Sequence, residues 1–282
     1  MFKDKTITVF GGTGTIGSLI VEELVKQEPY SIRIFSNDEH SLVKAQRRWI
    51  SYGNLRYLIG DIRDYERCCL ALRKADYVFN CAAIKHVPVA EYNPIEAVNV
   101  NILGLDNIIY ATIKQNVKKL LHISTDKACE PSTIMGMTKR ISETLLQRRW
   151  YQNPDTQMVA VRLGNVWGSR GSIVPYIHKC IKENKPISIT DTEMQRFFMS
   201  PQETVDFILK TFKEGKDGEI WIPKLKETSL MEVVEKEAGK GYPIHIIGNC
   251  RGEKLREKLL APEEIRIADH THRDYWILPA RL

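Results

Sequence analysis

The sequence has little that would indicate a metal centre, a disulfide framework or a membrane span. Its 282 residues include six cysteines, but no two of them form a Cys-x-x-Cys pair and none is spaced with histidine in a metal-binding pattern. No apolar run approaches the roughly 18 residues that are needed to cross a bilayer. We therefore expect reduced thiols, no bound metal, no membrane association and a cytoplasmic location.

Positive charge is present but not concentrated. The formal net charge is +6 at pH 7, yet the basic residues are spread along the chain and form no basic patch interleaved with aromatic residues. We therefore expect no nucleic-acid partner, and a phosphorylated small substrate explains the excess charge equally well. With 43% apolar and 27% charged residues, the chain has the composition of an ordinary globular protein.

The first half of the chain alternates apolar runs of strand length with longer amphipathic stretches. This alternation predicts βαβ units around a parallel sheet. Residues 1–165 are therefore expected to form an α/β, Rossmann-type, doubly wound domain. Strands are expected at residues 6–10, 31–35, 55–59, 77–80, 119–124 and 158–163, and helices at 18–27, 66–72, 94–115 and 135–151.

The second half has a different pattern. After Asn165 the segments are short, and prolines recur at positions 175, 186, 201, 223, 243 and 262 without a clean alternation of strands and helices. We expect residues 166–282 to form a smaller lobe that binds the substrate, with the ligand held between the two parts.

Residues 11–17, with the sequence GGTGTIG, follow the first expected strand and open the first expected helix. A glycine cluster alone could be only a tight turn, but here the strand, the spacing and the helix all agree with a dinucleotide-binding turn. Backbone N–H groups and the helix dipole would face a pyrophosphate. We expect a nicotinamide dinucleotide here, held by Gly11, Thr13, Gly14, Thr15 and Ile16.

The ends of the next two strands bear on which cofactor is bound. An acidic residue after the second strand would accept a hydrogen bond from the ribose of NAD. The sequence instead has a small Ser36, which leaves room for a 2′-phosphate, and Asn37 or the basic residues 44, 47 and 48 could contact that phosphate. NADP is therefore favoured, although Asp38 keeps NAD possible. Asp61, after the third strand, is placed to reach adenine or is simply a turn aspartate.

Two further stretches carry a family resemblance. Residues 124–128, STDKA, lie at the end of an expected strand, and residues 135–139, MGMTK, lie in the following helix. Together with the glycine turn they resemble the extended short-chain dehydrogenases/reductases, and within them the bacterial nucleotide-sugar 4,6-dehydratases that act on UDP-N-acetylglucosamine. The resemblance extends along the chain through residues 82–88 (AAIKHVP), 162–166 (RLGNV), 168–172 (GSRGS) and 251–255 (RGEKL).

The resemblance implies a reaction in which C4 of the sugar is oxidised, water leaves across C5 and C6, and the hydride returns at C6. Oxidation at C4 acidifies the C5 proton, so the site needs a base there and an acid for the departing C6 hydroxyl. By resemblance Asp126 is the acid. Lys127 is the candidate base, which requires that burial or a cation such as Lys85 or Lys139 lower its pKa. Taken alone, adjacent Asp and Lys could be a solvated ion pair.

The signature Tyr-x-x-x-Lys of the superfamily is altered in this chain. By resemblance Lys139 holds the nicotinamide ribose and Asn101 supports that lysine. At the place of the tyrosine stands Met135, whose thioether carries no proton to exchange. Thr125 or Asp126, directly or through water, is our candidate for replacing the tyrosine. The alternative is an inactive enzyme in which Met135 fills the core.

The resemblance also implies further binding residues. The planar fork of arginine suits a diphosphate, and a carboxylate such as Glu253 suits ribose hydroxyls. Further cofactor contacts are expected at Ile62, Ala82, Ala83, Lys85, Asn101, Ser124 and Lys139. UDP-sugar contacts are expected at Lys85, Asn165, Val166, Arg170, Ser172, Thr190, Met194, Arg196, Arg251 and Glu253.

These observations favour a nucleotide-sugar dehydratase or 5-epimerase that recycles its cofactor. It would act on UDP-N-acetylglucosamine or its 5,6-ene derivative and give a UDP-4-keto-6-deoxy-N-acetylhexosamine, with the L-altro product expected, in pseudaminic acid or surface polysaccharide biosynthesis. The alternatives are a UDP-sugar 4-reductase or 4-epimerase and an inactive NADP(H)-sensing protein. Pairing through the helices at 94–115 and 135–151 would give a homodimer or a higher homo-oligomer.

Overall fold

An eight-stranded sheet forms the centre of the molecule, which is seen in a computed structural model that describes residues 1–152, 155–248 and 252–280. The strand order is β13-β10-β6-β5-β4-β1-β2-β3, and only β13 runs antiparallel to its neighbour. This order confirms the expected doubly wound α/β fold. The strands are β1 (Thr6–Phe10), β2 (Ser31–Ser36), β3 (Leu55–Ile59), β4 (Tyr77–Asn80), β5 (Lys119–Thr125), β6 (Gln157–Leu163), β10 (Ile220–Pro223) and β13 (Tyr275–Leu278).

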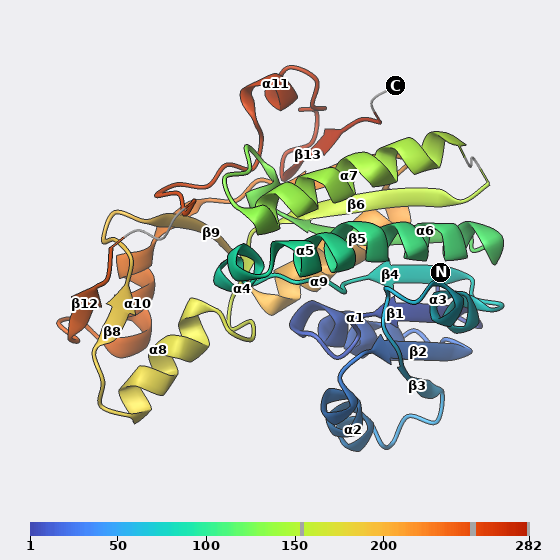
Figure 1. The fold of residues 1–282 in the computed structure, drawn as a ribbon, viewed down its shortest axis with the longest axis horizontal. Coiled ribbons are helices and arrows are strands. Elements are labelled where there is room, and N and C mark those ends of the chain that lie inside the picture. The colour runs from blue at the N-terminus through green and yellow to red at the C-terminus, as the bar shows by residue number, and fades with distance from the viewer. Residues whose placement is uncertain (153–154, 249–251, 281–282) are drawn as a thin grey trace.

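Helices cover both faces of this sheet, as Figure 1 shows. α1 (Thr15–Val25) and α9 (Pro201–Glu214) pack together on one face, and α3 (Tyr65–Leu72), α6 (Gly104–Lys114) and α7 (Ile134–Gln152) pack on the other. A parallel sheet covered on both faces has apolar central strands, and every residue of β1 is buried. The other helical segments are α2 (Glu39–Arg48), α4 (Val87–Tyr92), α5 (Pro94–Val98), α8 (Ile173–Lys182), α10 (Leu230–Ala238), α11 (Pro262–Ile265) and the 3₁₀ turn η2 (Asp126–Ala128).

The six strands expected in the first half are present within one residue of their expected bounds. The helix expected over residues 94–115 is instead divided into α5, the π-helical segment η1 (Asn99–Leu103) and α6. In the middle of η1, the Asn101 side chain accepts a hydrogen bond from Ile84 N at 2.8 Å and donates one to Ile84 O at 3.0 Å. Apolar periodicity cannot reveal such a π turn, because it depends on a side-chain contact with a distant loop.

The second half of the chain contributes to two regions. α9, β10 and β13 belong to the large sheet and its cover. α8, α10, β8 (Ile187–Ile189) and β12 (Ile244–Ile246) form a small lobe with its own apolar cluster, seen at the left of Figure 1. β7 (Asn165–Val166), β9 (Gln195–Met199) and β11 (Glu227–Ser229) form a separate three-stranded sheet. The sequence boundary at residue 165 therefore does not separate the two regions in space, because the chain returns to the large sheet after it.

Within the described ranges, no helix combines the length and the apolar character that a membrane span requires. The same residues contain no group of three or more histidine, cysteine, aspartate or glutamate side chains that could hold a metal ion.

Candidate active site

The glycine-rich turn between β1 and α1 packs closely against the end of β4. Gly11 has a φ of +68°, and a Cβ there would lie 2.7 Å from the backbone nitrogen of Ala82. A Cβ on Gly17 would lie 2.3 Å from the carbonyl oxygen of Gly11. Gly14 is the N-cap of α1 and provides no capping side chain. The first N–H groups of the helix are therefore left for an anionic partner such as a pyrophosphate.

A cavity of about 360 Å³ adjoins this turn. Two of the three basic residues considered for a 2′-phosphate, Lys44 and Arg48, line it, and Arg48 is also ion-paired with Glu22. Arg47 is not among the lining residues. The remaining walls include Thr13, Gly14, Thr15, Ser18, Ser41, Trp49, Trp167 and Arg170.

The end of β2 is arranged around Ser36. This residue is buried, and its hydroxyl accepts a hydrogen bond from Thr13 Oγ1 at 2.9 Å. Asn37 is exposed. Asp38 is the N-cap of α2 and accepts a hydrogen bond from Ser41 N at 3.2 Å; its hydrogen bonds with Ser41 hold the pKa of Asp38 below its ordinary value. Since Asp38 caps a helix, its presence needs no NAD ribose to explain it.

The structure gives Asp61 and Ile62 partners within the protein. Asp61 forms two hydrogen bonds with the guanidinium of Arg63, at 3.0 and 2.7 Å, and this contact lowers the pKa of the carboxyl group. The Ile62 side chain is buried, and a Cβ on Gly104 would lie 2.6 Å from its Cδ1. Their cofactor contacts therefore remain predictions.

Arg170 and Lys85 lie at the glycine turn. Arg170 N donates to Thr15 Oγ1 at 3.1 Å, the Arg170 guanidinium donates to the Thr13 carbonyl, and Lys85 Nζ donates to the Arg170 carbonyl at 2.6 Å. Neither residue is among those that line the second cavity, which lies beside the end of β5. The loop that carries Arg170 thus folds back onto the glycine turn, and its expected contact with UDP stays a prediction.

Lys139, on α7, is buried beneath the end of β5. Its ammonium donates to Ile123 O at 2.7 Å and lies 3.4 Å from His122 Nε2. Burial lowers the pKa of Lys139 to about 8. The expected contact with Asn101 is not direct. The Asn101 amide donates to Thr138 Oγ1 at 2.9 Å, so Asn101 supports the helix at the residue before Lys139.

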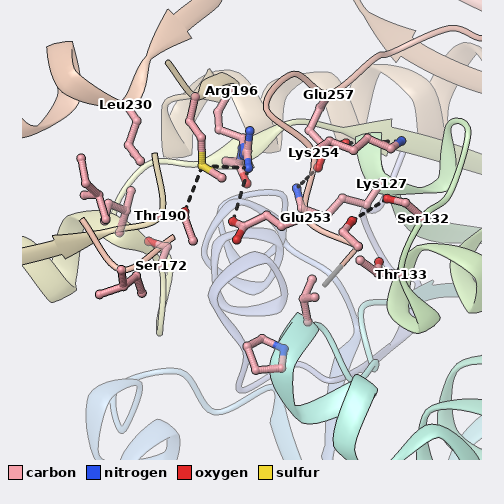
Figure 2. Close-up of a pocket in the computed structure, with 18 of the residues that line it drawn as sticks. Lys127, Ser132, Thr133, Ser172, Thr190, Arg196, Leu230, Glu253, Lys254 and Glu257 are labelled. Atoms are coloured by element: carbon pink, nitrogen blue, oxygen red, sulfur yellow. Dashed lines mark hydrogen bonds and ion pairs between the residues drawn. The ribbon is translucent and has the colours of Figure 1, made fainter. Parts of the chain in front are cut away.

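The second cavity, of about 380 Å³, lies between the end of β5, the sheet β7-β9-β11 and the small lobe (Figure 2). We call it the larger cavity because it exceeds the cavity of about 360 Å³ at the glycine turn. On one side of the cavity, Arg196 Nη2 lies 3.4 Å from Glu253 Oε1. Arg196, which is expected to bind the diphosphate, thus faces Glu253, which is expected to bind a ribose. Val166 is buried and is not a lining residue, and Arg251 lies outside the described residues. The expected residues that do line the cavity are Lys127, Asn165, Ser172, Thr190, Met194, Arg196 and Glu253.

Lys127 lies between two carboxylates. Its Nζ is 3.0 Å from Asp126 Oδ1 and 3.7 Å from Glu257 Oε1. Thr125 Oγ1 also donates to Asp126 Oδ1, at 2.8 Å. Burial by itself lowers the pKa of Lys127, but Asp126 and Glu257 outweigh burial and raise the pKa above its ordinary value. The expectation of a lowered pKa for Lys127 is therefore wrong, and neither Lys85 nor Lys139 is among the groups that act on it.

Met135 begins the first turn of α7 and is only 3% exposed. It packs in an apolar cluster with Ala90 and Ala97, and partly buried Ile84 and Val87 complete that cluster. Its thioether adds no titratable group to the site. Met135, which the resemblance puts at the place of the signature tyrosine, is thus a core side chain.

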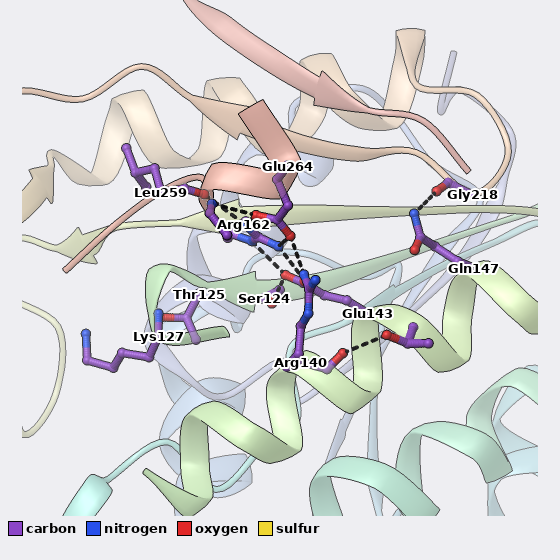
Figure 3. Close-up of polar contacts among 12 residues, drawn as sticks. Ser124, Thr125, Lys127, Arg140, Glu143, Gln147, Arg162, Gly218, Leu259 and Glu264 are labelled. Atoms are coloured by element: carbon purple, nitrogen blue, oxygen red, sulfur yellow. Dashed lines mark hydrogen bonds and ion pairs between the residues drawn. The ribbon is translucent and has the colours of Figure 1, made fainter. Parts of the chain in front are cut away.

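A buried ion network supports the end of β5 (Figure 3). Arg162, from β6, is fully buried and forms paired hydrogen bonds with Glu143 of α7, at 3.0 and 2.7 Å, and with Glu264 of α11, at 2.7 and 2.9 Å. Arg140 also pairs with Glu264. Ser124 donates to Glu143 Oε1 at 2.6 Å, so the hydroxyl expected to contact the cofactor is used within the protein.

The sequence interpretation assigned no role to Glu143, Glu257 or Glu264. Glu257 lines the larger cavity. Glu143 and Glu264 both pair with Arg162, which also donates to the carbonyl oxygen of Leu259 in the segment that carries Glu257. The available signals were weak. Arg162 stands in the RLGNV motif, and Glu257 stands four residues after Glu253, just beyond the RGEKL motif. Nothing local predicts that such distant carboxylates converge.

Comparison with known proteins places the chain among nucleotide-sugar enzymes. A family model described as polysaccharide biosynthesis protein matches residues 7–279. The chain is 42% identical to an uncharacterized membrane protein of Methanocaldococcus jannaschii over 94% of this chain and 83% of that one. It is 39% identical to the UDP-N-acetylglucosamine 4,6-dehydratase (inverting) of Campylobacter jejuni, over 99% and 84%, and 38% identical to the UDP-glucose 4-epimerase of Rickettsia akari, over 95% and 81%.

One solved structure is especially similar in shape. The crystal structure of Pen from Bacillus thuringiensis superimposes with a TM-score of 0.96, at 39% identity, over 100% of this chain and 91% of that one. These similarities confirm the resemblance to extended short-chain dehydrogenases/reductases and to the UDP-N-acetylglucosamine 4,6-dehydratases.

Proposed function

The chain belongs to the polysaccharide biosynthesis protein family, and from that premise we propose that it is a UDP-N-acetylhexosamine 4,6-dehydratase or 5-epimerase. Its substrate is UDP-N-acetylglucosamine or the 5,6-ene derivative, and its product is a UDP-4-keto-6-deoxy-N-acetylhexosamine, with the L-altro form favoured. The proposal includes a role in pseudaminic acid or surface polysaccharide biosynthesis.

One observation carries this proposal. The Asp126–Lys127 pair at the end of β5 adjoins a cavity whose other side presents Arg196 and Glu253. A cation for a diphosphate and acid–base groups for the sugar are thus available in one space. A catalytically inactive NADP(H) sensor would have no use for such a cavity.

The glycine turn fits a nicotinamide dinucleotide, since Gly11 and Gly17 let the backbone pack closely upon itself and Gly14 leaves the first N–H groups of α1 without a capping side chain. When bound, the cofactor would accept a hydride from the sugar and return it. We propose NADP, because Lys44 and Arg48 line the adjoining cavity, with NAD as the alternative. The buried Lys139 would hold the nicotinamide ribose, and Asp126 would protonate the departing hydroxyl.

A UDP-sugar 4-epimerase is the second candidate. The similarity to the Rickettsia protein named UDP-glucose 4-epimerase favours it. Met135 does not separate the two candidates, because both reactions begin with oxidation at C4 and a buried thioether accepts no proton in either. Asp126 favours the dehydratase, because 4-epimerisation releases no C6 hydroxyl and needs no acid for one.

We also propose a homodimer or a higher homo-oligomer that pairs through α5, η1, α6 and α7. Large apolar side chains on these segments are exposed: Ile95 (69%), Leu103 (53%), Tyr110 (44%), Met137 (44%) and Ile141 (49%). Exposed apolar groups of this kind are typical of protein–protein contacts. Light scattering on the purified protein tests this directly, and a monomer at micromolar concentration would contradict it. The cytoplasmic location and the absence of membrane association stay predictions.

The test of the activity is incubation of the NADP-loaded protein in deuterated water with UDP-N-acetylglucosamine or, separately, its 5,6-ene. NMR at C5 and C6 should show deuterium at C5 and a 4-keto-6-deoxy product. Asp126→Asn should abolish that product while still binding UDP. Unchanged substrate in both incubations refutes the proposed function, whereas inversion at C4 alone identifies the epimerase.

A further inference from the structure

The proposed dehydration requires a base for the C5 proton, but Lys127 is surrounded by groups that keep it charged. Asp126 faces Lys127 from the same strand end and Glu257 from the C-terminal segment, at 3.0 and 3.7 Å. The other charged groups nearby are Arg196 of β9 and Lys254, which lies 3.8 Å from Glu257. Two carboxylates at these distances stabilise an ammonium ion. An ammonium ion donates hydrogen bonds and cannot accept a proton.

Glu257 has the features that Lys127 lacks. Its side chain is 6% exposed and lines the larger cavity (Figure 2). Oε1 faces Lys127, whereas Oε2 is buried and has no hydrogen-bond partner in the described part of the chain. The nearest cation to Oε2, Lys254, already donates to the carbonyl oxygens of Cys129 and Glu130. A buried carboxylate oxygen is costly without a donor. Asp126 Oδ2 is in the same state, so each of the two carboxylates beside Lys127 keeps one oxygen for a proton.

We propose that Glu257 is a further catalytic residue, the base that takes the C5 proton of the UDP-sugar, and that Lys127 is the cation joining Glu257 to Asp126. This inference rests on the proposed function. It assigns the C5 proton to a carboxylate that faces the cavity and leaves Lys127 in the charged form that the surrounding groups stabilise.

The proton transfers balance without an added reagent. The C5–H bond breaks, its proton goes to Glu257 Oε2, and its electron pair forms the C5–C6 double bond. The C6–O bond breaks, and the hydroxyl leaves as water with a proton that Asp126 passes on from the Lys127 ammonium. The site is restored when Glu257 gives its proton to Lys127. For the 5,6-ene, the same carboxylate would return a proton to C5.

Glu257→Gln tests this with little change in shape. Deuterium incorporation at C5 should fall by about 10² to 10⁴-fold, which is the range for loss of a general base. The acidic limb of the pH–rate profile, which is the fall in rate at low pH as Glu257 takes up a proton, should disappear. The dissociation constant of UDP should stay within twofold. Glu257→Asp keeps a carboxylate and should retain the acidic limb at intermediate rate. Glu263→Gln, at an exposed neighbouring position, is the matched control and should behave as wild type.

Two outcomes would overturn the inference. If Glu257→Gln exchanges the C5 proton within tenfold of wild type while Lys127→Met does not, the lysine is the base. If Glu257→Gln is slow but keeps the acidic limb, Glu257 only positions Lys127.

A measurement without substrate separates this inference from the proposed function. In protein labelled with ¹⁵N at lysine Nζ, the Lys127 resonance is identified as the one that is absent from Lys127→Met. At pH 9 this resonance should have the chemical shift of an ammonium ion, and the pKa of Lys127 should fall in Glu257→Gln. A neutral Lys127 at pH 8 overturns the inference, whatever the substrate. Failure of wild type to label C5 in either sugar, with Lys127 charged, refutes the proposed function instead.

Discussion

Replacement of Glu264 by glutamine is expected to destabilise the protein by about 3 kcal/mol at pH 7. Glu264 is almost fully buried, and its contacts with Arg162, with help from Arg140, lower its pKa from 4.5 to about 2 although burial alone would raise it. Each unit of pKa corresponds to about 1.4 kcal/mol, so the lowering of the Glu264 pKa corresponds to about 3 kcal/mol of stability. Removal of one partner of a buried ion pair costs about 3 to 5 kcal/mol. The two routes therefore agree.

The pH dependence of this contribution has a definite sign. The pKa of Glu264 is lower in the folded state than in the unfolded chain, so the carboxylate stabilises the fold fully above about pH 5. This stabilisation is lost as the pH falls from about 5 toward 2, where the folded state also takes up the proton. Glutamine has no such titration. The difference in stability between wild type and Glu264→Gln should therefore shrink as the solution is acidified.

The assay is urea unfolding followed by tryptophan fluorescence, with free energies extrapolated to water at several pH values between 7 and 3. Glu263→Gln, at the exposed neighbour, should change the free energy of unfolding by less than about 0.5 kcal/mol. A loss below 1 kcal/mol for Glu264→Gln at pH 7, or a difference from wild type that stays constant down to pH 3, would refute the argument.

Three further predictions concern the site. Gly136→Ala should lower kcat at least tenfold, because its Cβ would lie 2.3 Å from the carbonyl oxygen of Lys127. Gly53→Ala is the control and should keep the wild-type kcat, because no atom lies within 4 Å of a Cβ there. Equal kcat values for the two variants would contradict the prediction. Arg170→Ala should weaken NADPH binding about tenfold, the equivalent of a contact worth about 1.4 kcal/mol, because the Arg170 guanidinium donates to the glycine turn. The assay is a titration that follows nicotinamide fluorescence. Unchanged affinity would count against a role of Arg170 in cofactor binding. Met135→Tyr should lower the free energy of unfolding by about 1 to 3 kcal/mol, because a larger, polar side chain enters an apolar cluster, and an unchanged urea midpoint would show that the cluster accommodates it.

Much of the architecture could be predicted from the sequence, because its signals are local. The runs at residues 6–10 and 55–59 are strands with those bounds, because the periodicity that indicates a strand lies within a short stretch of consecutive residues. The glycine turn follows for the same reason: strand, glycine spacing and helix stand within one short segment. The seven stretches that resemble the dehydratases also led to the family, because each is a contiguous segment of chain.

The charge state of the site was decided only by the tertiary structure. Adjacent Asp126 and Lys127 are visible in the sequence, but the third group, Glu257, is 130 positions away and reaches Lys127 only because the C-terminal segment folds back over β5. Arg162 holds that segment by its contacts with Leu259 and Glu264, about 100 positions away. Burial and Coulomb interactions depend on distance in space, and sequence separation does not report it. The sequence therefore determined the fold, the cofactor turn and the family. Packing between distant segments determined that Lys127 lies between two carboxylates that favour its charged form, that Arg170 contacts the glycine turn, and that Met135 is part of the core.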